Sequence, residues 1–223
     1  KSDIKKGILG INIGPNKDTK DQKNDFCLGL KFFFDIADYI TVNISSPNTE
    51  GLRDFHDQEK LKDLLLALNK IKKERKTKIP LLLKISPDIN DSTIDEISEI
   101  AIDNSITALI LTNTTNINRN NLIELQKNEI AGLSGKPLED ISNNIIKKFY
   151  KKLSGKIIII GVGGVDSGKS AYNKIISGAS LVQLYTGMIF KGPEVVKNIK
   201  KDLINHLKND GVKNFKEIIG QGI

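Results

Sequence analysis

The sequence predicts an α/β fold, a (β/α)8 TIM barrel of which about six of the eight β/α units lie in this chain. Six short apolar runs of β-type residues are each followed by a stretch with helical periodicity, which is typical of a parallel sheet covered by helices. Each run ends in polar residues or glycine, so potential ligands gather where barrel enzymes have their active sites. An open doubly wound sheet is the alternative, and these polar strand ends favour the barrel.

The elements follow one another in a regular order. The predicted strands are residues 8–14, 38–46, 80–87, 106–115, 156–164 and 179–187. Helices are expected at residues 61–74, 92–102, 141–153 and 171–178, and in the tail after Pro193. A complete barrel needs eight strands, so we expect two more to precede Lys1. No linker or repeat divides the chain, and residues 1–223 are expected to form one domain, the C-terminal part of a barrel.

Composition excludes several classes of protein. No apolar run approaches the roughly 20 residues that cross a bilayer, and the single cysteine, Cys27, rules out an internal disulfide framework. The net charge of +7 comes from lysines interleaved with acids, without the aromatic-studded basic strip of a nucleic-acid surface, so we expect no nucleic-acid partner. His56 and His206 lack metal-ligand spacing, and no metal is predicted.

Two strand ends are dense in amides and hydroxyls. In NISSPNTEGLR (43–53), Asn43 and Asn48 can each donate and accept, which matches the C=O and N–H edge of a pyrimidine or isoalloxazine ring. The same residues are good turn formers, and spacing alone leaves the choice open. A second cluster, TNTT (112–115), repeats the pattern on another strand. Two such clusters at one barrel mouth favour a shared ligand.

Lys84 ends the apolar run LLLK, where a buried cation needs an anionic partner. A reduced flavin with negative charge near N1 is one such partner. The alternative is a lysine whose stem is buried while its amine reaches water.

The segment GVGGVDSGKS (161–170) fits the P-loop pattern through Gly163, Gly168, Lys169 and Ser170. Taken alone, it predicts a nucleoside triphosphatase. No later apolar strand ends in an aspartate for Mg²⁺, and the segment follows the fifth strand rather than the first. In a barrel, the loops after the last two strands commonly bind a phosphate through backbone N–H groups, which explains the same glycines. The stretch GLSGKP (132–137) also permits a close backbone approach to a ligand.

Seven motifs together resemble the dihydroorotate dehydrogenase family. They are INIG, VNISSPNTEGLR, LLLKISPD, LILTNTT, GLSGKPL, IIGVGGVDSG and ASLVQLYTG, and they span essentially the whole chain. The resemblance implies a catalytic base at Ser46, where the fumarate- or NAD-using class has cysteine, and a proton relay through Thr49. It implies pyrimidine contacts from Asn43, Asn48, Asn113 and Thr114. It implies FMN contacts from Asn12, Asn43, Lys84, Thr112, Ser134, Gly135, Gly163, Gly164, Tyr185 and Thr186.

The implied reaction is oxidation of (S)-dihydroorotate to orotate in pyrimidine biosynthesis, with FMN as cofactor and a quinone as electron acceptor. C5 would lose a proton to Ser46 while C6 passes a hydride to the flavin. The serine implies the membrane-associated class, which lies peripherally on the bacterial or mitochondrial inner membrane. The family's N-terminal portion, with two strands and the helices that line the quinone tunnel, is absent from this sequence. A catalytically silent barrel fragment and a P-loop triphosphatase remain the alternatives.

Overall fold

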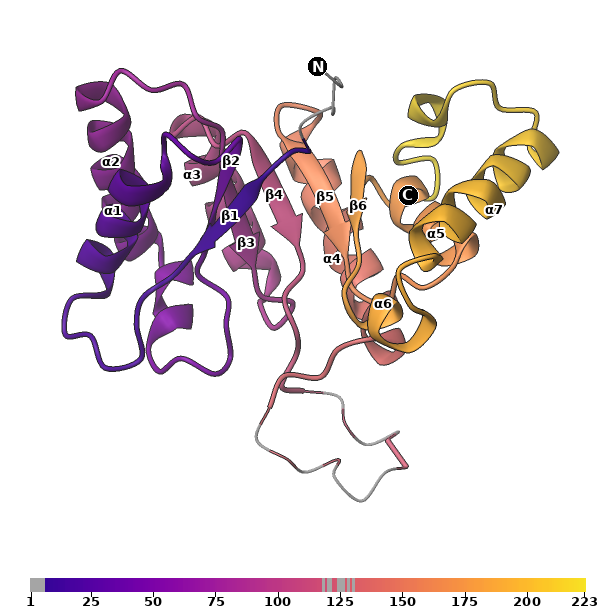
Figure 1. Ribbon diagram of the computed structural model, residues 1–223, viewed down its shortest axis with the longest axis horizontal. Helices are drawn as coiled ribbons and strands as arrows, with labels where there is room; N and C mark the ends of the chain where they lie inside the picture. Colours follow the sequence, from indigo (N-terminus) through magenta and orange to yellow (C-terminus); the bar gives the residue numbers. More distant parts are fainter. Residues whose placement is uncertain (1–6, 118, 120–121, 124–126, 128, 130) are drawn as a thin grey trace, which may run out of the picture.

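The computed structural model describes residues 7–117, 119, 122–123, 127, 129 and 131–223. Its described residues contain one parallel sheet with the strand order β1-β2-β3-β4-β5-β6 (Figure 1). The strands are β1 (Gly10–Ile13), β2 (Tyr39–Asn43), β3 (Leu81–Ile85), β4 (Ala108–Leu111), β5 (Ile158–Val162) and β6 (Leu181–Gln183). Each is shorter than its predicted run because the polar strand ends leave the sheet and form loops. The six predicted strands and their parallel pairing are confirmed.

Helices connect successive strands and continue after the last one. They are α1 (Gln22–Phe33), α2 (Gln58–Glu74), α3 (Asp91–Asp103), α4 (Glu139–Leu153), α5 (Gly168–Ile176), α6 (Thr186–Lys191) and α7 (Val195–Asn209). Short 3-10 helices occupy Leu52–His56, Lys136–Leu138 and Phe215–Ile218. The four predicted helices correspond to α2, α3, α4 and α5. The tail is helical in α7 and forms a single 3-10 turn at its end.

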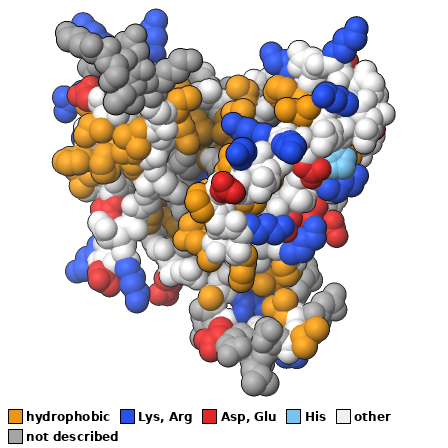
Figure 2. Space-filling view, turned by 45° about the vertical axis from the view of Figure 1, so that its right-hand side comes forward, with side chains coloured by type: hydrophobic (Ala, Val, Ile, Leu, Met, Phe, Trp, Pro, Cys, Tyr) orange, Lys and Arg blue, Asp and Glu red, His pale blue; other side chains and the backbone are white. Residues whose placement is uncertain are grey.

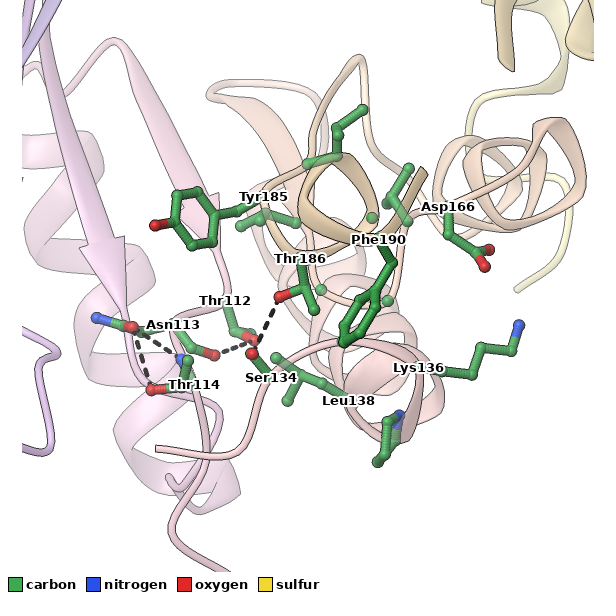
Figure 3. Close-up of a pocket in the computed structure, with 18 of the residues that line it drawn as sticks. Thr112, Asn113, Thr114, Ser134, Lys136, Leu138, Asp166, Tyr185, Thr186 and Phe190 are labelled. Atoms are coloured by element: carbon green, nitrogen blue, oxygen red, sulfur yellow. Dashed lines mark hydrogen bonds between the residues drawn. The ribbon is translucent and has the colours of Figure 1, made fainter. Parts of the chain in front are cut away.

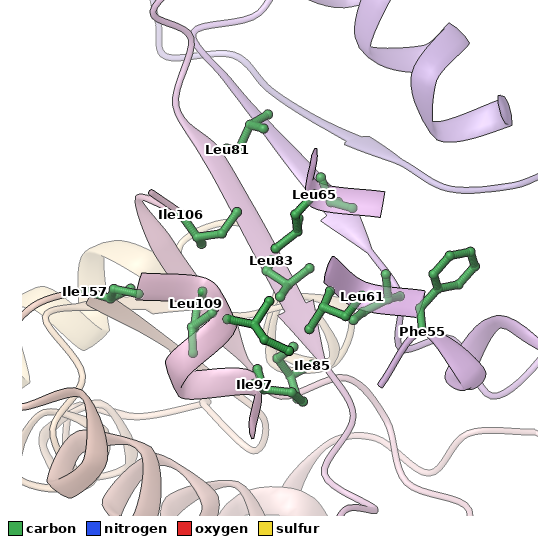
Figure 4. Packing of buried hydrophobic residues seen from close by; sticks show 14 of the residues in the cluster. Phe55, Leu61, Leu65, Leu81, Leu83, Ile85, Ile97, Ile106, Leu109 and Ile157 are labelled. Atoms are coloured by element: carbon green, nitrogen blue, oxygen red, sulfur yellow. The ribbon is translucent and has the colours of Figure 1, made fainter. Parts of the chain in front are cut away.

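The two faces of the sheet differ in what covers them. Alternate strand residues such as Val42, Leu83 and Leu109 belong to a large core shared with helices α1 to α4, part of which is drawn in Figure 4. The intervening strand residues, such as Leu82 and Ile110, face the other side of the sheet and form a small separate cluster made of strand residues alone. Each helix also contacts the next, from α1 to α5. Helices on one face are the arrangement of a barrel, whereas a doubly wound sheet has them on both.

Two helices were not predicted. Helix α1 carries a glycine, a cysteine and three phenylalanines, which lower helix propensity, so its sequence shows weak periodicity. It begins because the Asp21 carboxylate accepts a hydrogen bond from Asn24 N–H. Helix α6 lies where the sixth strand was expected to continue. The strand ends at Gln183, and Thr186 and Gly187 already belong to the helix.

Basic side chains are dispersed over the surface in view. On the face shown in Figure 2, lysines and arginines alternate with acidic and apolar groups and form no continuous strip. This face of the surface therefore shows the interleaving of lysines with acids that the sequence indicates. Within the described part of the chain, no helix combines the length and hydropathy of a membrane span.

Candidate functional site

A cavity of about 530 Å³ opens at the carboxyl ends of the later strands (Figure 3). Eight of the ten residues predicted to bind the cofactor line it: Lys84, Thr112, Ser134, Gly135, Gly163, Gly164, Tyr185 and Thr186. The predicted substrate residues Asn113 and Thr114 line it too. Asn12 lies instead in an adjoining cavity of about 120 Å³ on the inner face of the sheet, which Lys84 also lines. Residues distant in sequence thus converge on one mouth.

Hydrogen bonds join the tips of β2 and β4 through an amide cluster made of Asn43, Ser45, Asn113 and Thr114. The Asn113 amide donates to Ser45 Oγ at 2.9 Å and to Asn43 Oδ1 at 3.3 Å. Ser45 Oγ donates to Asn43 Oδ1 at 2.8 Å, and Thr114 N–H donates to Asn113 Oδ1 at 2.8 Å. Asn43 therefore reaches the cavity through Asn113 rather than lining it. The cluster fixes the orientation of each amide, so its remaining donors and acceptors point in set directions.

Ser46 lies in the turn that follows this cluster. Its Oγ accepts a hydrogen bond from Asn48 N–H at 3.2 Å, and Ser46 is partly buried while Asn48 is exposed. Gly132 covers this turn from above, since a Cβ on it would lie 3.1 Å from Pro47 Cγ and collide with Thr114. Among the described residues, no hydrogen bond joins the Thr49 side chain to Ser46, so the relay through Thr49 remains a prediction.

Lys84 is a partly buried cation between the two cavities. Burial lowers the pKa of its amine, because desolvation disfavours the charged form. Among the described residues no carboxylate lies within salt-bridge distance of it, although lysines elsewhere in the structure form such pairs. A buried amine without a counter-ion is the electrostatic arrangement that an anionic ligand would complete.

The opposite side of the cavity is made of backbone. Gly163 and Gly164 follow β5 with φ of 121° and 75°, and we call this pair the glycine turn. A Cβ on Gly164 would lie 2.8 Å from Glu139 Cα and 2.9 Å from Glu139 N. Only glycine fits between the turn and the start of α4. Across the cavity, Thr186 Oγ1 donates to Ser134 Oγ at 3.0 Å.

Comparison with known proteins identifies the family. The family model described as dihydroorotate dehydrogenase matches residues 1–207. The chain belongs to the dihydroorotate dehydrogenase family. Among its relatives, the dihydroorotate dehydrogenase (quinone) of Bartonella tribocorum is 44% identical over 96% of this chain and 60% of its own length. The mitochondrial dihydroorotate dehydrogenase (quinone) of Oryza sativa subsp. japonica is 40% identical over 98% of this chain and 49% of its own.

A solved structure agrees in fold. The crystal structure of DHODH from Eimeria tenella in complex with ferulenol superimposes with a TM-score of 0.92 at 35% identity, covering 98% of this chain and 62% of that one. The predicted (β/α)8 barrel class is thereby confirmed, and the residues that the structure describes contain six of its strands. The chain spans about 60% of the length of its bacterial relative. Membership in this family implies a flavin cofactor.

The P-loop interpretation finds no support in the geometry of residues 161–170. At the start of α5, Gly168 N–H donates to the Asp202 carboxylate at 3.0 Å, so an acid lies where a P-loop binds phosphate. Ser170 is buried, and its Oγ accepts hydrogen bonds from Asp166 N–H and Ser167 N–H instead of facing a metal. Lys169 Nζ lies 5.3 Å from the Tyr172 ring centroid. These three groups are already engaged within the fold.

A buried polar network supports the glycine turn from behind. Lys174 of α5 is fully buried, and its Nζ donates to Asn143 Oδ1 at 2.8 Å and to Glu139 O at 3.2 Å. The Glu139 carboxylate in turn pairs with Lys136 and accepts from the Asn173 amide. Burial lowers the pKa of Lys174 to about 7, although Glu139 opposes the shift. The start of α4, which contacts Gly164, is thus held by hydrogen bonds on its far side.

Sequence reasoning missed Ser45 and Arg53 as site residues, although both lie inside the NISSPNTEGLR motif. Ser45 is fully buried and belongs to the amide cluster. Arg53 donates to groups that follow three strands, β2, β3 and β4. His56 makes structural contacts: Nδ1 donates to Arg53 O at 2.8 Å, and Nε2 accepts from Ser86 N–H at 3.2 Å. Burial lowers the pKa of His56, which favours this neutral form. No metal-binding cluster of His, Cys, Asp or Glu occurs in the part of the chain described.

Proposed function

We propose that this chain is the catalytic part of a quinone-dependent dihydroorotate dehydrogenase that binds FMN and oxidises (S)-dihydroorotate to orotate in pyrimidine biosynthesis. The observation that carries the proposal is one cavity lined by Lys84, by the glycine turn, and by Asn113 and Thr114 of the amide cluster. Among the described residues, Lys84 has no carboxylate partner. The glycine turn suits a phosphate, the amide cluster suits the polar edge of a ring, and Lys84 supplies a partly buried cation on the cavity wall.

The residues present fit FMN. The volume of about 530 Å³ is in the range of small-molecule sites, and much of the lining is apolar, as a flat ring system requires. Gly163 and Gly164 would offer backbone N–H groups to the phosphate at a place where no side chain fits. Ser134 and Thr186 would add hydroxyls. Lys84 would hold the isoalloxazine through its negative edge, because its charge has no other partner among the described residues.

The chain's own groups supply the acid–base part of the reaction. When bound, FMN would accept the hydride that leaves C6 of dihydroorotate. Ser46 Oγ would take the proton from C5 as it gives up its own hydroxyl proton, and the Asn48 N–H that donates to this Oγ would stabilise the negative charge that the loss of the hydroxyl proton leaves on it. Asn43, Asn48, Asn113 and Thr114 would orient the pyrimidine. Thr49 would help to pass the proton onward.

The names of the relatives extend the proposal to the electron acceptor. The bacterial and plant relatives are named as quinone enzymes, and the plant proteins as mitochondrial. We infer that a quinone reoxidises the flavin and that the complete protein lies peripherally on the inner membrane, bacterial or mitochondrial. The contact with the membrane surface would come from the N-terminal region that the longer relatives possess. Flotation of the complete protein with lipid vesicles, compared with residues 1–223 alone, tests this placement.

Spectroscopy of the complete protein tests the function. The purified protein should show a flavin absorption band near 450 nm, and extraction should release FMN. Anaerobic addition of dihydroorotate should bleach the band, and a soluble quinone should restore it. A colourless protein, or a flavin that dihydroorotate leaves oxidised, would contradict the proposal. Residues 1–223 alone, assayed in parallel, test the alternative of a silent fragment, which gains flavin only when the remaining strands are supplied.

A further inference from the structure

Arg53 joins the tips of three neighbouring strands. It lies in the 3-10 helix Leu52–His56 that follows β2, and its guanidinium donates in three directions. Nε donates to Ser45 O at 3.4 Å after β2, Nη1 to Asp88 Oδ2 at 2.9 Å after β3, and Nη2 to Thr114 O at 3.3 Å after β4. The planar guanidinium is suited to such a role because its donors have fixed relative directions. Its side chain is 27% exposed, and that of Asp88 is 10% exposed.

Asp88 extends these contacts to the loop that leaves β4. Its Oδ1 accepts from the fully buried Thr115 hydroxyl, and its Oδ2 also accepts from Asn116 N–H at 3.0 Å. Thr115 pairs with Leu133 in an antiparallel bridge, so the outgoing and returning ends of the loop meet there. The returning end is the one that lays Gly132 on Thr114. Asp88 therefore fixes the part of the loop that covers the Ser46 turn.

The contacts reach the amide cluster through its backbone. Arg53 binds the carbonyls of Ser45 and Thr114, two residues whose side chains belong to that cluster. Ser45 also precedes Ser46 directly in the chain. His56 supports the arrangement from below, because it accepts from Ser86 N–H and donates to the Arg53 carbonyl. The β2 tip, which carries the serine, and the β4 tip, which carries Asn113, are thus joined by the amide cluster and also by Arg53, which the ion pair to Asp88 orients.

We propose that Arg53 and Asp88 are positioning residues that set the geometry between Ser46 and the amide cluster, and through it the rate of proton removal from the substrate. Neither residue lines the cavity where the flavin would lie. The inference rests on the proposed function and separates the residues that position the substrate side from those that bind the flavin. The Arg53–Asp88 pair governs the substrate side and leaves flavin binding unaffected.

The test uses the complete protein with the substitutions Arg53→Gln, Arg53→Lys and Asp88→Asn, and the double variant Arg53→Gln/Asp88→Asn. All rates are measured anaerobically and expressed per flavin-loaded site. We expect Arg53→Gln to keep FMN affinity within about twofold but to slow flavin reduction by dihydroorotate about 10- to 100-fold, since misplacement of about 1 Å has an effect of that size. Orotate affinity, from the perturbed flavin spectrum, should fall about tenfold. Arg75→Gln is the matched control, because Arg75 lies over the Phe34 ring at the end of α2.

Two further comparisons distinguish positioning from general stability. Arg53→Lys can keep the ion pair but cannot reach both carbonyls. Its melting temperature should therefore lie closer to that of the wild type than the melting temperature of Arg53→Gln does, while flavin reduction stays at least about fivefold slower than in the wild type. Flavin reduction in the double variant should be no slower than in the slower of the two single variants, because both substitutions disrupt the same ion pair.

Several outcomes overturn the inference. Wild-type reduction rates in Arg53→Gln, full recovery of the rate in Arg53→Lys, multiplying effects in the double variant, or loss of flavin from all variants would each do so. The last outcome would mean that the pair holds the fold or the flavin rather than the substrate side. A wild-type flavin that dihydroorotate does not reduce would instead refute the proposed function.

Discussion

The two sides of the cavity are built on different principles. On the side of β2 to β4, the amide cluster presents side chains that hydrogen-bond to one another, and Arg53 binds the backbone carbonyls of Ser45 and Thr114. Ser46 lies in the turn that follows. On the side of β5 and β6, the glycine turn presents backbone, and the side chains that support it lie behind, in the network around Lys174. One side is suited to recognising the edge of a ring, and the other to surrounding a phosphate.

This difference determines how each side can be damaged. The side-chain half should fail when a substitution removes an atom, because each polar group there has a specific partner. The backbone half should fail when a substitution adds an atom, because its function depends on the absence of a Cβ. Substitutions on the two sides should therefore show opposite sensitivities.

The largest effect is expected from Ser46→Ala in the complete protein. Removal of Oγ takes away the proposed base while the cavity residues that would hold FMN remain. Flavin reduction by dihydroorotate should slow by about two orders of magnitude or more, as measured by anaerobic stopped-flow at 450 nm. Bound FMN should be unchanged. Ser92→Ala is the control, since Ser92 is exposed at the start of α3. Normal reduction kinetics in Ser46→Ala would remove Ser46 from its role.

On the backbone side, Gly164→Ala should lower FMN affinity by about tenfold or more, because the added methyl meets the backbone of Glu139 and the residue has φ of 75°. Fluorescence titration of the apoprotein with FMN measures the effect. Gly155→Ala is a matched control: Gly155 has φ of 77°, but nothing lies within 4 Å of its Cβ position. It carries the same backbone strain without the collision. Equal FMN affinities in the two variants would refute the role assigned to the glycine turn.

Lys84 lies where the two sides meet, and Lys84→Ala should affect the flavin rather than the proton transfer. Removal of a partly buried cation that has no carboxylate partner in the described part of the chain should release FMN or lower its two-electron potential by about 30 mV, which corresponds to about 1.4 kcal/mol. Spectroelectrochemical titration measures the shift. Lys191→Ala is the control, because Lys191 lines the same cavity but is paired with Asp166. An unchanged spectrum and potential in Lys84→Ala would mean that the amine reaches water and serves no anion.

Patterns of nearby residues in the sequence predicted the features that depend on local sequence, namely the strands, the helices and the polar strand ends. Alternating apolar runs and amphipathic stretches gave six strands and four helices, and the polar strand ends gave most of the cavity lining. The P-loop pattern misleads because the group that binds the start of α5 is the carboxylate of Asp202 in α7, which is 34 residues away from Gly168 in the sequence. The same limit hid the Arg53 contacts, since Asp88 is 35 residues from Arg53 and Thr114 is 61. Pairings of this length are fixed by tertiary packing and leave no periodic signal in the sequence.

A further effect concerns stability and comes from the network behind the glycine turn. Lys174 has a pKa of about 7 when folded and 10.5 as the ordinary value, so between these pH values the unfolded chain binds more protons. Stability should therefore rise with pH across this window, by at most about 1.4 kcal/mol per pH unit from this group, and stay level below it.

Lys174→Met should flatten that slope. Urea unfolding of the complete protein at pH 7 and pH 9, followed by fluorescence, measures the difference between wild type and variant, in which contributions from other groups cancel. Lys156→Met, at an exposed position, should retain the wild-type slope. If Lys174→Met also retained it, the amine would not be held in a desolvated site behind Gly164. The backbone side would then depend on the glycines alone, without a buried polar support.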